Sequence, residues 1–238
     1  MPVLTTPRRP LPDQAVVSLH GALAGNPRAG ATLTDPIDRT LITSDGTVTT
    51  MLEACTGEPI VTVLVRQSGP ASLAVLEREI GRWWQPSTEL LDLAPAERLI
   101  ARRVLLTGRH SGAAFVAAES LVVADRLPDP TVFDIDRVGT SLGRLLNTSG
   151  LATRRRIVEV VEARDAAVSA RLGVTRTACL ARRTYTIATT EQTLAAVTEW
   201  IVPGRLAAHI AATGLGLGHA TCPTRPRPWD RHMFAVDL

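Results

Sequence analysis

The chain contains no lysine, and all 26 of its basic residues are arginine. Without lysine there is no Schiff-base catalysis, no lysine-bound pyridoxal phosphate and no phosphate-binding loop that depends on a lysine. Arginine instead favours planar, bidentate recognition of carboxylates and phosphates. A high-GC coding bias is the simplest origin of this replacement, so the absence of lysine narrows the chemistry but identifies no ligand.

Cysteine and histidine are also scarce. The three cysteines, Cys55, Cys179 and Cys222, form no C-x-x-C pair, and the five histidines show no metal-ligand spacing. The sequence therefore predicts neither a disulfide framework nor a zinc site.

Long apolar runs are missing as well, because no segment approaches the length of a membrane span. The first residues, MPVLTTPRRPLPDQ, lack the apolar core of a signal peptide. Basic residues are dispersed along the chain, without a coherent helix that would enter a nucleic-acid groove. We therefore expect a cytosolic protein with neither a membrane nor a nucleic-acid partner.

The composition that remains, 45% hydrophobic and 21% charged, is typical of a globular domain with a substantial core. Prolines are frequent in the first 36 residues, and glycine, proline and arginine are frequent in the stretch GLGLGHATCPTRPRPWDRH near the other end. The sequence predicts a flexible arm over residues 1–34, a folded domain over 35–203 and a tail over 204–238. Trp229 and Phe234 are candidates to pack the tail against the domain.

Within the folded domain, segments of helical and of strand periodicity follow one another. Hairpins and short connections join the predicted strands, which favours an α+β fold with an antiparallel sheet over βαβ units. The expected elements are helix Val48–Ala54, strand Ile60–Gln67, helix Ser72–Trp84, a hairpin over 98–125, helix Val138–Asn147, strand Leu151–Glu162, helix Asp165–Leu172, strand Arg176–Ala188 and strand Thr193–Val202.

Two charged residues interrupt the apolar faces of the predicted hairpin. With the two-residue period of a strand, Arg102 falls on an otherwise apolar face of the first arm, and Glu119 falls on one of the returning arm. An unpaired buried charge costs several kcal/mol, so each residue needs a partner. Arg102 and Glu119 either form a structural ion pair across the hairpin or meet a ligand, and periodicity alone does not decide between these readings.

A third charge lies in the last predicted strand, where Glu199 shares a face with Val197 and Ile201. A carboxyl group that is removed from water can exchange a proton near neutral pH, because burial raises its pKa. Glu199 is therefore a candidate acid or base, although a glutamate that reaches solvent from an edge strand also fits. Arg183 alternates with apolar neighbours in the preceding strand in the same manner.

Five stretches of the chain occur in the order and at the spacing of one known family, across about residues 35–203. They are SDGTVTTMLE at Ser44–Glu53, RVLLTGRHSGAAFVAAESLVVADRLP at Arg103–Pro128, SLGRLLNTSGLAT at Ser141–Thr153, ARRTYTI at Ala181–Ile187 and VTEWIVP at Val197–Pro203. On these stretches the chain resembles the chorismate lyase family, in particular its actinobacterial and cyanobacterial branch of chorismate pyruvate-lyases.

The resemblance implies a six-stranded antiparallel sheet with helical flaps over an enclosed active site. It also implies that enolpyruvate is removed from chorismate, a small carboxylate, to give 4-hydroxybenzoate and pyruvate without a metal or an organic cofactor. The family's carboxylate-binding arginine corresponds to Arg102, and its essential glutamate corresponds to Glu199. The flap residues expected to contact the substrate correspond to Val48, Thr49, Leu142 and Gly143.

Two departures from the family pattern concern basic residues. Thr50 occupies a position where relatives commonly carry arginine or lysine, and Glu119 replaces an arginine of the proteobacterial form. Glu119 is then either part of the substrate site or the partner that orients an arginine. If the replaced arginine binds a substrate carboxylate in the relatives, another arginine must bind that carboxylate here, and the candidates are Arg66, Arg103 and Arg183.

Two other functions fit the same residues. The first is a specialised-metabolism enzyme, such as one of antibiotic biosynthesis, that acts on a related enolpyruvyl ring or cyclises a polyketide-like chain. The second is the ligand-sensing domain of a transcription regulator, although we do not expect the Pro-rich residues 1–34 to supply a winged helix-turn-helix. The sequence does not indicate an oligomeric state.

Overall fold

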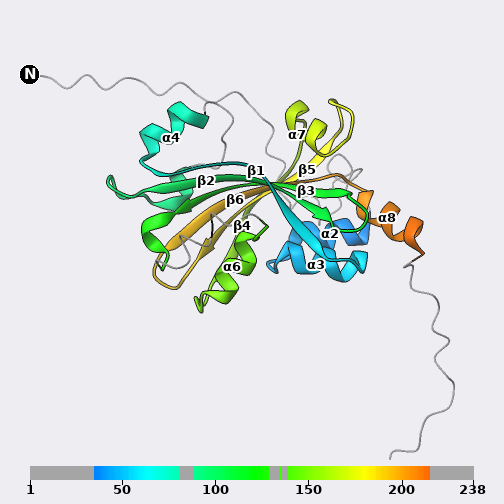
Figure 1. Cartoon of the computed structure of the whole chain (residues 1–238), viewed down its shortest axis with the longest axis horizontal. Coiled ribbons are helices and arrows are strands. Elements are labelled where there is room, and N and C mark those ends of the chain that lie inside the picture. The colour runs from blue at the N-terminus through cyan, green and yellow to red at the C-terminus, as the bar shows by residue number, and fades with distance from the viewer. Residues whose placement is uncertain (1–34, 81–87, 129–134, 136–138, 215–238) are drawn as a thin grey trace, which may run out of the picture.

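A computed structural model of the protein describes residues 35–80, 88–128, 135 and 139–214 and contains one six-stranded sheet (Figure 1). All neighbouring strands are antiparallel, and their order across the sheet is β1-β2-β3-β6-β5-β4. This arrangement confirms the predicted α+β class and the six-stranded antiparallel sheet. The strands are β1 (Ile60–Ala71), β2 (Leu99–Gly108), β3 (Ala114–Val123), β4 (Arg154–Ala163), β5 (Leu180–Ala188) and β6 (Thr193–Ile201).

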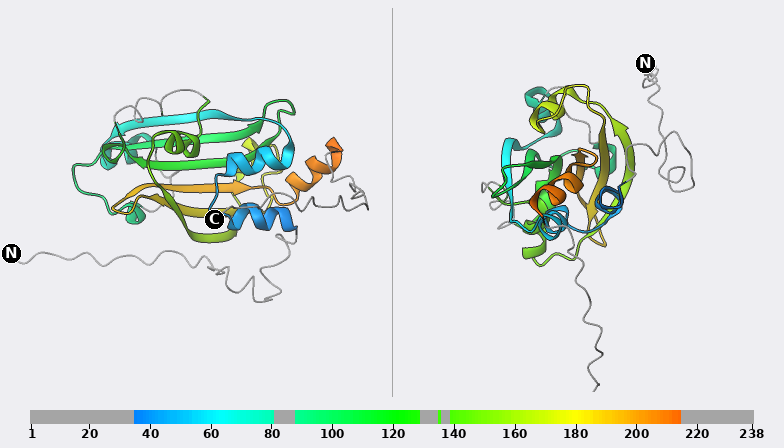
Figure 2. Two further views of the ribbon diagram at one scale, coloured as in Figure 1. Left: turned by 90° about the horizontal axis from the view of Figure 1, so that it is seen from below. Right: turned by 90° about the vertical axis from the view of Figure 1, so that its right-hand side faces the viewer.

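Helices cover both faces of the sheet, which curves around the side that carries α3 and α8 (Figures 1 and 2). On that side lie α2 (Pro36–Thr43), α3 (Val48–Thr56), α6 (Leu142–Thr148) and α8 (Arg205–Thr213). On the other side lie α4 (Leu73–Ile80) and α7 (Ala166–Arg171). Within the described ranges, no helix is long and apolar enough to cross a membrane.

The core consists of two apolar layers, one on each face of the sheet. Ile201 and Val197 pack in the clusters that include the helices of the concave side. On the other face, Leu121 packs in the cluster that includes α4, and Trp200 packs in the cluster that includes α7. The central strands β3 and β6 are buried on both faces, which explains why their sequences are almost continuously apolar.

The register of the β2–β3 hairpin corrects one of the two readings of its charges. Arg102 lies opposite Ser120, and Arg103 lies opposite Glu119. A shift of one residue moves a side chain to the other face of a sheet. Arg102 and Glu119 therefore lie on opposite faces, and the ion pair across the hairpin is formed by Arg103 and Glu119 instead.

Two helices were not expected from the sequence. Asp35 caps α2 by accepting hydrogen bonds from the N–H groups of Ile37 (2.7 Å) and Asp38 (3.4 Å), and Pro36 occupies the first turn. The second helix, α8, lies within the segment predicted as a tail. Its apolar face buries Leu206 against α2 and α3, so the folded part continues beyond residue 203.

The other predicted elements are present with shifted ends. The helix predicted over Ser72–Trp84 corresponds to α4, and residues 81–87 lie outside the described ranges. The predicted arm over 1–34 and the tail residues 215–238, with Trp229 and Phe234, also lie outside them.

Candidate functional site

A pocket opens between the concave face of the sheet and the N-terminal ends of α3 and α6. It contains about 530 Å³ of empty space when its open mouth is included. Five strands form its floor and the two helix ends form its cover. The lining residues are Thr47, Val48, Thr49, Arg102, Val104, Leu106, Ala118, Ser120, Ser141, Leu142, Gly143, Arg155, Tyr185, Ile187, Val197 and Glu199.

The structure brings together six of the eight residues that the sequence predicted for the site. Arg102 and Glu199 reach the floor from β2 and β6, two strands that β3 separates in the sheet. The four flap residues, Val48, Thr49, Leu142 and Gly143, all lie in the cover. Glu119 and Arg183 do not line the pocket.

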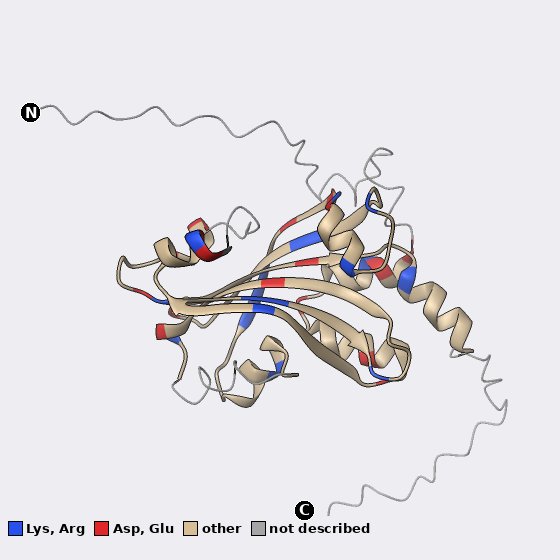
Figure 3. Ribbon diagram, turned by 45° about the horizontal axis from the view of Figure 1, so that its top comes forward, with Lys and Arg blue, Asp and Glu red and all other residues tan. Residues whose placement is uncertain are grey.

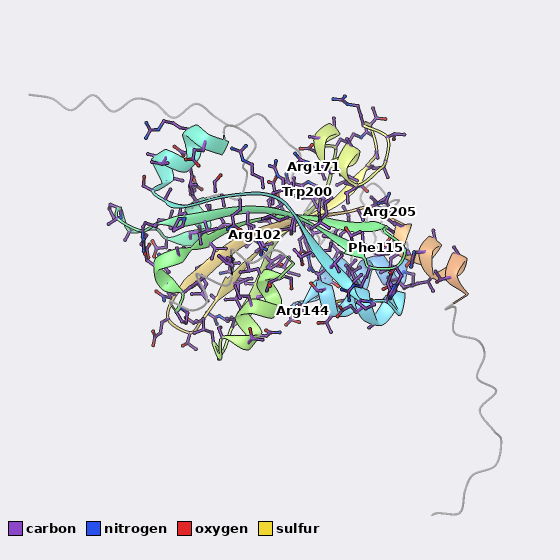
Figure 4. The ribbon with its side chains drawn as sticks, in the orientation of Figure 1. Arg102, Phe115, Arg144, Arg171, Trp200 and Arg205 are labelled. Atoms are coloured by element: carbon purple, nitrogen blue, oxygen red, sulfur yellow. The ribbon has the colours of Figure 1, made fainter. Side chains whose placement is uncertain are left out.

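Arg102 is a buried charge on β2, the second strand from the β1 edge of the sheet (Figure 4). Its residue is only 2% exposed, and its neighbours in the lining include Val104 and Ser120. A guanidinium group in such a pocket presents paired N–H donors in the geometry that a carboxylate accepts.

Glu199 is held from two sides by the neighbouring strand β5. The Nε atom of Arg183 donates a hydrogen bond to one carboxylate oxygen (2.7 Å), and the hydroxyl of Tyr185 donates one to the other (3.0 Å). The Glu199 residue is 4% exposed, so these contacts take the place of water. Burial, together with the negative charge of Glu199, raises the pKa of Tyr185 far above its ordinary value, and its hydroxyl therefore remains a donor.

Arg183 lies behind Glu199 and connects it to the end of α2. Its NH1 group donates to the carbonyl oxygens of Leu41 (2.8 Å), Ile42 (3.3 Å) and Ser44 (2.9 Å). These carbonyls belong to the C-terminal turn of the helix and the residue beyond its end, where a cation is favourable. Burial opposes the charge of Arg183, but Glu199 and the surrounding contacts raise its pKa above the ordinary value. The residue therefore orients Glu199 rather than the ligand.

The cover depends on the close approach of α3 and α6. A Cβ atom at Gly143 would lie 2.9 Å from Cγ2 of Thr47 and 3.2 Å from NH2 of Arg155, so only glycine fits without displacement. On the outside, Arg144 of α6 pairs with Glu53 of α3 (2.5 Å). The segment Leu142–Arg144 thus connects α6 to α3 through its glycine and its arginine.

Glu119 and the three replacement arginines lie elsewhere. Glu119 pairs with Arg103 on the face that carries α4 and α7, and its burial raises the pKa of its carboxyl group despite the arginine. Arg66 on β1 donates to the backbone carbonyl of Glu79 and does not reach the pocket. Figure 3 shows blue and red segments on several neighbouring strands of the sheet.

The second arginine of the pocket is Arg155, which the sequence reading missed. It lies in a run of three arginines, Arg154 to Arg156. Because all three are charged, the run shows no alternation of polar and apolar residues that would indicate a strand face. Its NH2 group donates to Oγ1 of Thr47 (3.2 Å), and its NH1 group donates to the carbonyl of Asp45 (3.4 Å). Arg155 shares the half-buried face of the strand with Ile157, two residues further on, and this two-residue period was the signal available in the sequence.

Among the described residues, no group of three or more histidine, cysteine, aspartate or glutamate side chains is placed to hold a metal ion. The polar groups of the lining are arginine, hydroxyl and a single carboxylate. Such a set is suited to an organic anion with an apolar body.

Comparison with known sequences gives several mycobacterial relatives, of which two are described. The chain is 28% identical over 131 residues to the chorismate pyruvate-lyase of Mycobacterium leprae (strain TN) and 28% identical over 115 residues to that of Mycobacterium tuberculosis (strain CDC 1551 / Oshkosh). These matches cover 51% and 48% of this chain, and 52% and 53% of the relatives. The match therefore spans about half the length of the curated relatives. No family model matches the chain.

Among solved structures, the chain is similar to the effector domain of PhnF from Mycobacterium smegmatis, with a TM-score of 0.50. The similarity covers 68% of this chain and 91% of that domain at 16% sequence identity. At this identity the likeness concerns the fold alone.

Proposed function

We propose that the protein removes the enolpyruvyl group from chorismate and releases 4-hydroxybenzoate and pyruvate. The observation that carries this proposal is the convergence of Arg102 and Glu199, from separate strands, on one pocket under α3 and α6. The similarity to chorismate pyruvate-lyases over half of the chain supports it.

The reaction is an elimination that aromatises the ring. The hydrogen on the ring carbon that bears the hydroxyl leaves as a proton, and its electron pair enters the ring. The C–O bond to the enolpyruvyl group breaks, and the leaving enol takes up a proton to become pyruvate. Atoms and electrons balance without an oxidant, a reductant or a metal, so the protein has only to orient the ring and to move a proton.

The pocket offers a residue for each of these tasks. Arg102 binds the ring carboxylate through paired hydrogen bonds. Glu199 accepts the ring proton, and the guanidinium of Arg183 and the hydroxyl of Tyr185 hold its two carboxylate oxygens in place. Val48 and Leu142 cover the apolar face of the ring, while Thr49 and Gly143 shape the cover around it.

The test is the release of pyruvate from chorismate by the purified protein, followed with lactate dehydrogenase and NADH, together with chromatographic detection of 4-hydroxybenzoate. Equal amounts of the two products support the proposal. Absence of turnover by a protein that is folded, as judged by its circular dichroism, overturns it.

A ligand-binding domain without catalysis is the second candidate, and the fold shared with a regulator's effector domain favours it. That alternative expects chorismate or 4-hydroxybenzoate to bind at Arg102 without any product. An enzyme for another enolpyruvyl ring expects turnover of that ring and none of chorismate. Pyruvate release from chorismate therefore identifies the lyase, and the same assay with other enolpyruvyl rings separates the remaining two candidates.

A further inference from the structure

We propose that Arg155 binds a second carboxylate of the ligand, so that the pocket is built for a ring that carries two separate acidic groups. The proposal rests on the proposed function for the identity of the ring acid. It adds a residue, and therefore a substrate requirement, that Arg102 and Glu199 do not provide.

The partners of Arg155 are the first argument. Its guanidinium donates to a hydroxyl, Oγ1 of Thr47, and to a backbone carbonyl, that of Asp45, and both acceptors are neutral. Among the described residues, no carboxylate lies within ion-pair distance of it. Six other arginines of the described chain pair with a carboxylate: Arg98, Arg103, Arg126, Arg144, Arg182 and Arg183.

The charges of the pocket are the second argument. The lining contains two guanidinium groups, Arg102 and Arg155, and one carboxylate, Glu199. Because Arg183 pairs with Glu199 from behind, the charge of that carboxylate is already balanced. The charge of Arg155 thus meets no carboxylate of the described lining, and a second negative charge on the ligand would match it.

The placement of the two arginines is the third argument. Arg102 comes from β2 and Arg155 from β4, and three strands of the sheet lie between them. The floor between the two contains apolar side chains, among them Val197 and Ile187. Two cations, separated by a floor that is apolar apart from Ser120, Glu199 and Tyr185, correspond to a ring with one carboxylate on its carbon frame and another on a substituent.

Arg155 also places the ligand's second carboxylate next to the N-terminal ends of α3 and α6, which cover the pocket. Its present acceptor, Thr47, is the first residue before α3, and Gly143 of α6 lies against both of them. An anion bound by Arg155 at this point can also accept a hydrogen bond from the Thr47 hydroxyl. The substituent of the ring would thus lie where the two helix ends meet.

Calorimetric titration with two stable probes tests the proposal without requiring turnover. The dicarboxylate probe is 3-(1-carboxyvinyloxy)benzoate, and the monocarboxylate probe is 3-methoxybenzoate. In the Arg155→Gln variant we expect the Kd of the dicarboxylate to rise about 10- to 100-fold, as befits one lost charged hydrogen-bond pair. The Kd of the monocarboxylate should change less than about 2-fold. Arg155→Lys should recover part of the loss.

Two variants serve as controls. Arg156→Gln removes an exposed charge from the next position of the same strand and should leave both Kd values unchanged. Arg102→Gln should weaken both probes, because both carry the ring carboxylate. Circular dichroism melting of each variant shows that it is folded.

The outcomes separate this proposal from the proposed function. Equal weakening of both probes by Arg155→Gln, no weakening of either, or a wild type that does not prefer the dicarboxylate overturns the role of Arg155. A wild type that prefers the dicarboxylate through Arg155 but releases no pyruvate from chorismate upholds the second carboxylate site and overturns the lyase assignment.

Discussion

At the scale of single residues, the pocket depends on how its buried charges are matched. Arg183 neutralises Glu199 on one side and satisfies the carbonyl groups at the end of α2 on the other. One buried arginine thus fixes the position of a carboxylate in the pocket relative to a helix outside it. Such contacts also explain why a charge can be kept in the core, where it would otherwise be costly.

Replacement of Glu199 tests its assignment as the base. Glu199→Gln keeps the size of the side chain and an oxygen acceptor for Arg183 but cannot accept the ring proton. We expect kcat for pyruvate release to fall by about 100-fold or more, the usual contribution of general base catalysis. The exposed Glu191→Gln is the matched control and should be as active as the wild type. An unchanged kcat in Glu199→Gln would rule out acid–base work by this residue.

Asp38 of α2 predicts a pH dependence of stability. Burial raises the pKa of its carboxyl group, and the nearby Asp35 raises it further, although the N–H of Gly204 donates to its Oδ2 atom and opposes the shift. The folded state therefore holds this proton more tightly than the unfolded state. The stability that comes from protonation is present at low pH and is lost as the pH rises through the raised pKa.

Asp38→Asn removes this dependence while an oxygen acceptor for Gly204 remains. We expect the variant to be more stable than the wild type at pH 7, with a difference that shrinks as the pH falls towards 4. Urea unfolding at several pH values measures it, and the exposed Asp45→Asn serves as control. A difference that grows as the pH falls would contradict the raised pKa.

At the scale of elements, strand periodicity predicted correctly which charged residues are buried, but it did not predict which residues pair across the strands. The two-residue period correctly indicated that Arg102 and Glu199 are buried among apolar neighbours, because both lie in strands covered on two faces. Pairing across the hairpin depends on the turn and on an irregularity near Leu106, and an error of one residue assigned Glu119 to the wrong arginine. Arg155 was missed because its neighbours carry the same charge.

The pair of Arg103 and Glu119 has a structural role in this account. Glu119→Leu alone leaves a buried guanidinium without its carboxylate and should lower the free energy of unfolding by about 3 kcal/mol. The double variant Arg103→Met/Glu119→Leu should recover most of that loss and release pyruvate at the rate of the wild type. Urea unfolding and the pyruvate assay measure the two effects. A double variant that is stable but inactive would place this pair in the substrate site.

Gly143 is the point at which α6 approaches α3. Gly143→Ala adds a methyl group 2.9 Å from Cγ2 of Thr47, which displaces one helix end from the other. Since alanine also favours a helix, we expect the free energy of unfolding to change by less than about 1 kcal/mol. The Kd of 4-hydroxybenzoate should nevertheless rise by about 3-fold or more. The exposed Asn147→Ala, in the same helix, should leave this Kd unchanged. Tight binding in both variants would show that the cover does not require the close approach.

At the scale of the whole molecule, one sheet carries two separate sets of buried charges. On the face with α4 and α7, Arg103 and Glu119 satisfy each other. On the concave face, Arg102, Arg155 and Glu199 surround a pocket under helices that come from distant parts of the chain. The fold class followed from the sequence, whereas α2 and α8, which close the end of this face, did not. Both helices are shorter than ten residues, and their packing partners include residues far away in the chain.

The central claim is that this pocket holds an aromatic acid by its carboxylate. The most direct test is a crystal structure of the protein with 4-hydroxybenzoate. We predict that the ligand carboxylate lies about 2.7–2.9 Å from the guanidinium nitrogens of Arg102, with its ring between the sheet and the residues Val48 and Leu142. A ligand bound outside this pocket, or one whose carboxylate lies away from Arg102, would contradict the account.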